Sequence, residues 1–173
     1  MTAERWRPLA AGIGSRTEGE LAATPAELKR IASDLDLVAC DSFVLAYVLK
    51  PSAGGAIHLR GTLTARVTQT CVVTLDPLPA VVTAALEAEL WPEDEMPKGS
   101  DEETVDVLSD ASLEPIREGR IDLGGLAFEL LSVSLDPYPR KQGATFEDIA
   151  EEVPPEGKPL AALAKLKDLP KRS

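Results

Sequence analysis

Few side chains in this sequence have the chemistry of a catalytic centre. The chain contains one histidine, His58, so a Ser–His–Asp or Cys–His arrangement would have to use it. His58 falls on the polar parity of a predicted strand, where a solvent-exposed histidine is the simpler interpretation. Cys40 and Cys71 lie far apart with no Cys-x-x-Cys spacing, and Cys71 falls on the apolar parity, where burial disfavours a thiolate. We therefore expect no catalytic residue, no metal site and no cofactor.

Acidic residues concentrate in one part of the chain. Residues 87–122 contain thirteen acids against three bases, whereas residues 1–86 contain eight of each. Their spacing is not that of a calcium loop. A solvated acidic loop is the simpler interpretation, and a surface that attracts a basic protein is the alternative. On that alternative the candidate partner-binding residues are Glu93, Asp94, Glu95, Asp101, Glu102 and Glu103.

Two smaller groups of basic residues are candidates for contact with RNA phosphates. Arg60 and Arg66 share the polar parity of a predicted strand with several threonines, but no aromatic side chain accompanies them for base stacking. A solvated polar face is the simpler interpretation there. Lys165 and Lys167 belong to a leucine-bearing C-terminal segment. That segment could contact RNA, or dock on the acidic residues of the same chain.

The composition is that of an ordinary globular protein. The chain has 173 residues, of which 44% are hydrophobic and 27% charged, and its formal net charge is −11. This charge excludes a basic nucleic-acid binder as a description of the whole protein. No apolar run reaches the ~20 residues of a membrane span, and no secretory signal is found at the N-terminus. We expect a cytoplasmic protein that does not bind membranes.

Hydrophobic periodicity and helix caps predict an α+β fold. Thr24-Pro25-Ala26-Glu27 is a capping box, and Asp122 can cap a second helix. Three alternating segments predict an antiparallel meander. The long middle strand exceeds usual strand lengths, so we expect a bulge or bend at Gly61 or Gln69, and with it a strongly bent sheet that could close into a partial barrel. The expected strands are 41–50, 56–75 and 79–91, and the helices that pack on them are 25–34 and 123–135.

The remaining segments complete the expected organisation. Residues 1–157 would form one domain that includes an acidic insert at about 92–112. Residues 158–173 would form a short basic C-terminal helix or tail, because Pro159 can begin a helix with leucines at helical spacing.

Several short motifs in a fixed order resemble one family. The segments QTCVVTLDP at 69–77, GRIDL at 119–123, DPYPRK at 136–141 and PLAALAKLK at 159–167 are similar to those of the large ribosomal RNA subunit accumulation protein family, YceD type. The sequences of the first and third segments resemble those of an alphaproteobacterial branch of this family. Many members carry Cys-x-x-Cys where this chain has Cys71-Val72-Val73-Thr74, so no metal or redox role of those cysteines transfers here.

The resemblance implies a role in the accumulation or processing of 23S ribosomal RNA and in assembly of the large ribosomal subunit, without known catalysis. An acidic protein of this kind suits binding of a basic ribosomal protein or assembly factor, and ribosomal RNA is a further candidate partner. Two alternatives from other classes remain. One is a metal-dependent RNA-processing hydrolase that uses the acidic residues, and the other is a small-ligand binding module on the concave side of the sheet.

Overall fold

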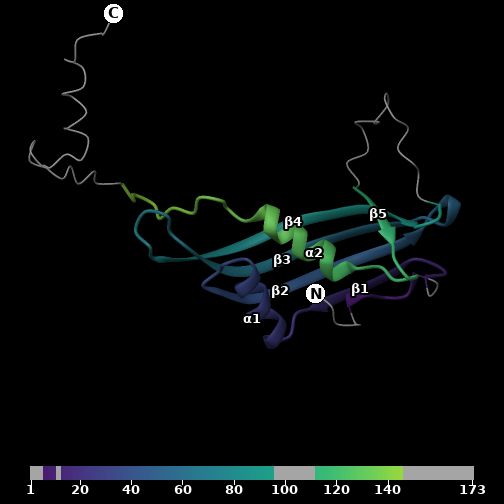
Figure 1. Ribbon diagram of the computed structural model, residues 1–173, viewed down its shortest axis with the longest axis horizontal. Helices are drawn as coiled ribbons and strands as arrows, with labels where there is room; N and C mark the ends of the chain where they lie inside the picture. The colour runs from purple at the N-terminus through teal and green to yellow at the C-terminus, as the bar shows by residue number, and fades with distance from the viewer. Residues whose placement is uncertain (1–5, 11–12, 96–111, 146–173) are drawn as a thin grey trace, which may run out of the picture.

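A computed structural model describes residues 6–10, 13–95 and 112–145, and these form one sheet with two helices (Figure 1). The predicted α+β class is therefore confirmed. The strands are β1 Thr17–Ala22, β2 Ala39–Pro51, β3 Ile57–Thr70, β4 Pro77–Pro92 and β5 Ser112–Ile116, and the helices are α1 Pro25–Asp34 and α2 Leu123–Ser134.

The sheet is mixed and open, which corrects two expectations. Among the described residues the strand order is β1-β2-β3-β4-β5, so β1 and β5 are the edges of the sheet and it does not close into a barrel. The first four strands pair antiparallel, as predicted for the meander, but β5 pairs parallel with β4. A parallel pair needs a connection of about a dozen residues or more. The acidic stretch between Pro92 and Ser112 supplies that length.

The alternation of β3 sets the position of the hydrophobic core. One parity of this strand is buried and the other faces away from the helices, as the sequence predicts. Gly61 interrupts the apolar parity because a Cβ there would lie 2.9 Å from the carbonyl oxygen of Ala46. The buried residues of β3 are Ile57, Leu59, Leu63, Ala65 and Val67.

β3 is shorter and more regular than the predicted strand 56–75. It ends at Thr70, because the next residues form a turn closed by the N–H of Cys71, which donates to the carbonyl of Asp76 at 2.8 Å. Its register against β4 is continuous along its whole length. The expected irregularity at Gly61 or Gln69 is therefore wrong, and the register shift lies in the neighbouring strand β2, just after Cys40.

Both predicted helices are present and are capped as expected. Thr24 Oγ1 accepts the N–H of Glu27 at 3.4 Å, and Glu27 Oε2 accepts the N–H of Thr24 at 2.7 Å. α1 has the predicted bounds, and α2 ends one residue before the predicted position. At the start of α2, Asp122 Oδ1 accepts the N–H of Gly125 at 2.9 Å. These bonds satisfy donors that the first helical turn leaves free.

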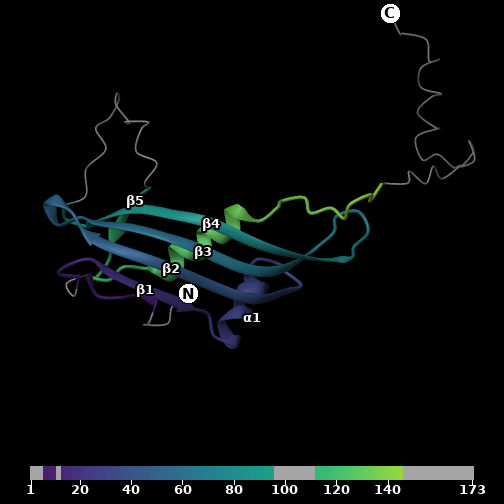
Figure 2. The same ribbon diagram turned by 180° about the vertical axis from the view of Figure 1, so that it is seen from behind.

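The two helices pack on the same face of the sheet (Figures 1 and 2). Ile31 of α1 and Leu131 of α2 belong to one core cluster with the buried side chains of β2, β3 and β4. The opposite face carries no helix in the described part of the chain and presents the polar parity of β3 to solvent. We call it the open face.

Some expectations fall on segments outside the described residues. These are most of the acidic insert 92–112 and the whole of the basic tail 158–173, and with them the boundary of the 1–157 domain. No helix in the described ranges is long and apolar enough to cross a membrane.

Candidate partner-binding site

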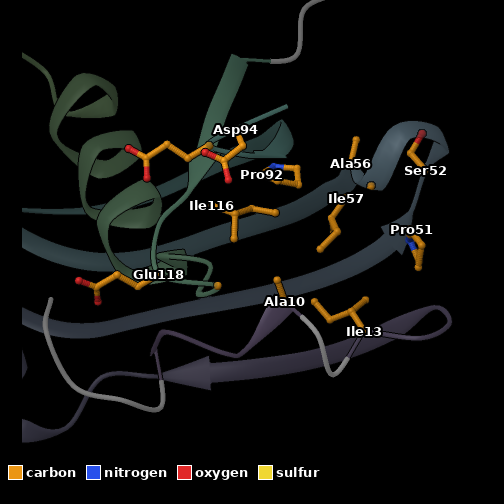
Figure 3. A pocket seen from close by; sticks show the side chains of 13 residues that line it. Ala10, Ile13, Pro51, Ser52, Ala56, Ile57, Pro92, Asp94, Ile116 and Glu118 are labelled. Atoms are coloured by element: carbon orange, nitrogen blue, oxygen red, sulfur yellow. The ribbon is translucent and has the colours of Figure 1, made fainter. Parts of the chain in front are cut away.

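A cavity of about 590 Å³ opens at the end of the sheet where β3 begins and β4 ends (Figure 3). Its lining comes from the N-terminal segment, the β2–β3 turn, the end of β4 and the β5–α2 connection. Ile57 and Ile116 are buried and form its apolar inner wall. Glu93, Asp94 and Glu118 line it as exposed acids, and no lysine or arginine is found among its described lining residues. We call this cavity the acid-rimmed pocket.

Two tight turns place the acids that follow β4. The N–H of Glu95 donates to the carbonyl of Pro92 at 3.0 Å and closes one turn. The other is the β2–β3 turn, where Gly55 has a φ of 75°. A Cβ on Gly55 would lie 3.0 Å from Glu95 Oε2, so glycine allows both the backbone conformation and the close approach. The two turns together hold Glu93 and Asp94 at the pocket.

The third carboxylate, Glu118, lies in the turn between β5 and α2. The N–H of Arg120 donates to the carbonyl of Arg117 at 2.9 Å, and the N–H of Ala10 donates to the carbonyl of Gly119 at 2.8 Å. Within this turn Glu118 has a φ of 53°, in the left-handed region that few residues other than glycine, asparagine and aspartate adopt. The fold thus holds a glutamate at the pocket in a conformation that costs about 1 kcal/mol or more.

The structure places three of the six acids proposed from the sequence. Glu93 and Asp94 line the acid-rimmed pocket, and the carboxylate of Glu95 lies against the turn that forms one of its walls. Outside the described residues lie Asp101, Glu102, Glu103, Lys165 and Lys167.

Arg60 and Arg66 lie on the open face, as predicted, and neither lines the pocket. Arg60 donates from Nε and a terminal guanidinium nitrogen to Glu87 Oε1, at 3.0 and 2.8 Å. His58 Nε2 lies 3.2 Å from the same oxygen. The hydrogen bonds from Arg60 are the main cause that lowers the pKa of Glu87 below its usual value. Arg60 thus forms a cross-strand ion pair with Glu87, and the imidazole of His58 lies beside the same carboxylate.

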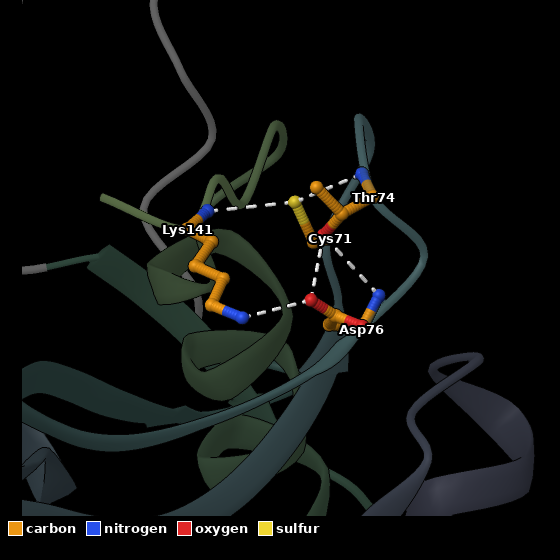
Figure 4. Close-up of polar contacts among 4 residues, drawn as sticks. All are labelled: Cys71, Thr74, Asp76 and Lys141. Atoms are coloured by element: carbon orange, nitrogen blue, oxygen red, sulfur yellow. Dashed lines mark hydrogen bonds and ion pairs between the residues drawn. The ribbon is translucent and has the colours of Figure 1, made fainter. Parts of the chain in front are cut away.

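Cys71 lies beyond the opposite end of β3, and its environment differs from expectation (Figure 4). The residue is buried, but its Sγ accepts the backbone N–H groups of Thr74 and Lys141, each at 3.4 Å. Hydrogen bonds with the Thr74 side chain and with these backbone groups lower the pKa of the thiol to about 6. The expectation that burial disfavours the thiolate is therefore wrong, because these donors outweigh the desolvation.

The same turn is tied to the segment after α2 (Figure 4). Lys141 Nζ lies 2.9 Å from Asp76 Oδ2, and the hydroxyl of Thr74 donates to that oxygen at 3.1 Å. These contacts lower the pKa of Asp76 and raise that of Lys141. The N–H of Val72 also donates to the carbonyl of Pro139 at 2.9 Å. The thiol and its donors thus join two segments that are distant in the sequence.

The sequence does not predict that Glu118 and the apolar wall of Ile57 and Ile116 line this pocket. The alternation of β3 places Ile57 in the core, but it does not show that Ile116 from β5 lies beside it. Only the turn sequence Glu118-Gly119 signals a left-handed position there. Within the described ranges, no three histidine, cysteine or acidic side chains converge to hold a metal ion.

The chain matches a known family over most of its length. The family model described as Large ribosomal RNA subunit accumulation protein YceD covers residues 59–167. The match extends from β3 through α2, so it includes all three acids that line the pocket. No curated protein and no solved structure matches the chain.

Proposed function

Because the chain belongs to the family of large ribosomal RNA subunit accumulation proteins, YceD type, we propose that it promotes 23S ribosomal RNA accumulation as a non-catalytic binding protein. Its partner is a basic ribosomal protein or assembly factor, which the acidic part of the chain attracts. Holding such a partner until it meets its RNA site would favour assembly of the large subunit.

The acid-rimmed pocket is the observation that supports this proposal most. It combines an apolar wall with three carboxylates, and its described lining contains no cation that would neutralise them. A surface of this kind attracts positively charged groups over a long range and repels the phosphates of RNA. Direct contact with protein is therefore favoured over direct contact with RNA at this end of the sheet.

The separation of the reactive side chains also favours binding over catalysis. His58 lies near the start of β3, beside Glu87 on the open face, whereas Cys71 follows the other end of the strand. Thirteen residues of extended chain place them about 40 Å apart. A histidine and a thiol at that distance cannot share one reacting atom.

Purification of the tagged full-length protein from cells of its source, with identification of co-eluting proteins and RNA, tests the proposal. We expect basic proteins or assembly factors of the large subunit to co-elute. The variant Glu93→Gln/Asp94→Asn/Glu95→Gln should recover less of them at an unchanged melting temperature. The control Glu18→Gln/Glu20→Gln removes exposed acids of β1 instead and should recover them normally. Recovery of ribosomal RNA alone, unaffected by either variant, would contradict the proposal.

A further inference from the structure

We propose that the acid-rimmed pocket receives a single lysine or arginine side chain from a basic protein segment. This inference rests on the proposed function and specifies how the partner is recognised. The acidic part of the chain would then act as more than a diffuse negative field, because one side chain of the partner would enter a defined cavity.

The shape and wall of the cavity fit such a side chain. A volume of about 590 Å³ lies within the range of roughly 300–1,000 Å³ found for ligand sites. Ile57, Ile116 and Pro92 offer apolar surface to the methylene groups of a long side chain. Lysine and arginine bury such a stem while their charged head stays near polar groups. A compact inorganic cation would leave this apolar wall unused.

Three exposed acids, Glu93, Asp94 and Glu118, lie at the edge of the cavity. Figure 3 shows Asp94 and Glu118 on one side of the cavity, with Pro51 and Ser52 on the other. Glu93 lines the same cavity. The acids come from two different segments, and no three of them converge on a metal position among the described residues. Because the carboxylates do not converge on one point, an ammonium or guanidinium group would hydrogen-bond to one of them and be attracted by the others at longer range.

Glu118, one of the acids at the cavity, also has a backbone conformation that is unusual for glutamate. Its φ of 53° favours glycine or asparagine. Stability alone would therefore select another residue at this turn. Strained residues of this kind gather at binding sites, where the surrounding structure holds them in place. The N-terminal segment supplies that support through the hydrogen bond between Ala10 and Gly119.

The test is a titration of the methyl-labelled full-length protein, followed by NMR. The probes are N-acetyl-lysine methylamide and N-acetyl-arginine methylamide. Their matched neutral controls are the norleucine and Nε-acetyl-lysine analogues. We expect saturable shifts of the Ile57 and Ile116 methyl groups with the charged probes, and at least about tenfold weaker binding of the neutral ones. Equal binding of charged and neutral probes would overturn the inference.

Two variants distinguish binding inside the pocket from attraction by the overall negative charge of the protein. Glu118→Asn removes one carboxylate and relieves the left-handed strain, so affinity should fall about two- to fivefold while the melting temperature stays equal or rises. Ser52→Trp keeps every charge but places a large ring at the exposed edge of the cavity, and should abolish the saturable shifts. The control Glu18→Gln/Glu20→Gln on β1 should change neither result.

The outcomes distinguish this inference from the proposed function. If Ser52→Trp still binds the charged probes, or if Glu18→Gln/Glu20→Gln weakens binding as much as Glu118→Asn, a diffuse field explains the attraction and the pocket inference is wrong. Capture of large-subunit proteins that persists in Ser52→Trp would likewise overturn the inference and leave the proposed function intact. Normal probe binding without any such capture would overturn the proposed function instead. An oligoribonucleotide that produces the same saturable shifts would contradict both.

Discussion

Val67 and Thr64 lie on opposite faces of β3, and they differ in how each tolerates a charge. Val67 is 1% exposed and belongs to the core cluster, whereas Thr64 is exposed on the open face beside Val44 and Thr83. A carboxylate introduced at Val67 would lose its hydration without gaining a partner. One introduced at Thr64 would stay in water.

We therefore expect Val67→Asp to lower the free energy of unfolding by about 3 kcal/mol or more, or to prevent folding. Thr64→Asp should cost less than about 1 kcal/mol. Urea unfolding followed by circular dichroism measures both. Similar midpoints for the two variants would mean that β3 does not have the register described here.

Cys71 should make stability depend on pH in a neutral range. Its folded pKa of about 6 lies below the ordinary thiol value of 9.0, so between these two pKa values the unfolded chain binds more protons than the folded one. Stability should therefore rise from about pH 6 to pH 9, and this contribution is lost at pH 6 and below, where the thiol becomes protonated in both states. Cys40 does not oppose this trend. Its pKa is raised above 9.0, chiefly by burial, so its thiol stays protonated in this range.

Urea unfolding of wild type and Cys71→Ala at several pH values between 6 and 9 measures this contribution. We expect the variant to be modestly less stable and to show a flatter pH dependence, while partner binding stays unchanged. Thiolate absorbance near 240 nm should titrate at about pH 6 in wild type and disappear from that range in the variant. A thiol that titrates at its ordinary value would contradict the hydrogen bonds assigned to it.

At the scale of elements, local signals in the sequence predict some parts of the fold and not others. The bounds of α1 follow from a capping box, and the three long strands follow from their alternation. Alternation does not predict β1, because one of its inward positions is Gly19. The ring of Tyr47 occupies the space where a side chain of residue 19 would lie. Nor does alternation predict β5, because this strand contains Pro115, which argues against a strand except at an edge.

The parallel pairing of β5 is a non-local property, and the pocket depends on it. No short-range pattern shows that the chain returns after the acidic stretch to run beside β4 in the same direction. Glu93 and Asp94 could be proposed from their charge alone. Their position near the β2–β3 turn follows from the predicted meander, because the end of β4 pairs with the start of β3. The position of Ile116 and Glu118 beside them follows only from the parallel pairing of β5.

Helix α1 offers a test of a single local element. In Thr24→Ala the N–H of Glu27 loses its acceptor, so we expect a loss of about 1 kcal/mol in the free energy of unfolding. Thr24→Ser retains the hydroxyl and should stay within about 0.5 kcal/mol of wild type. Thermal or urea unfolding measures both. Equal losses in the two variants would point to the threonine methyl group, and not to the cap.

For the molecule as a whole, the distribution of charge matters more than its sum. The net charge of −11 comes chiefly from residues 87–122, and residues 158–173 contain five bases and one acid. The sheet brings the ends of β4 and β5 together at the acid-rimmed pocket. Attraction of a basic partner should therefore concentrate at one end of the molecule.

This concentration predicts the kinetics of association with pre-ribosomal particles. Neutralising the six acids, with Gln for Glu and Asn for Asp, should slow association with little effect on dissociation or on the melting temperature, because long-range attraction acts before contact. The same variant should lose most of the salt dependence seen above ~0.15 M, where charges are screened within about 8 Å. The six positions are Glu93, Asp94, Glu95, Asp101, Glu102 and Glu103.

Deletion of residues 158–173 is the matched experiment, because a basic tail bound to RNA phosphates would also be sensitive to salt. The two routes thus differ in which segment matters and not in whether salt weakens binding. If the acids attract a basic protein, the deletion should leave the association rate nearly unchanged, or raise it where the tail competes for the acids. Stopped-flow or surface-based rate measurements at several salt concentrations compare the variants. A six-acid variant that associates at the normal rate, beside a tail deletion that does not, would assign the contact to the basic tail.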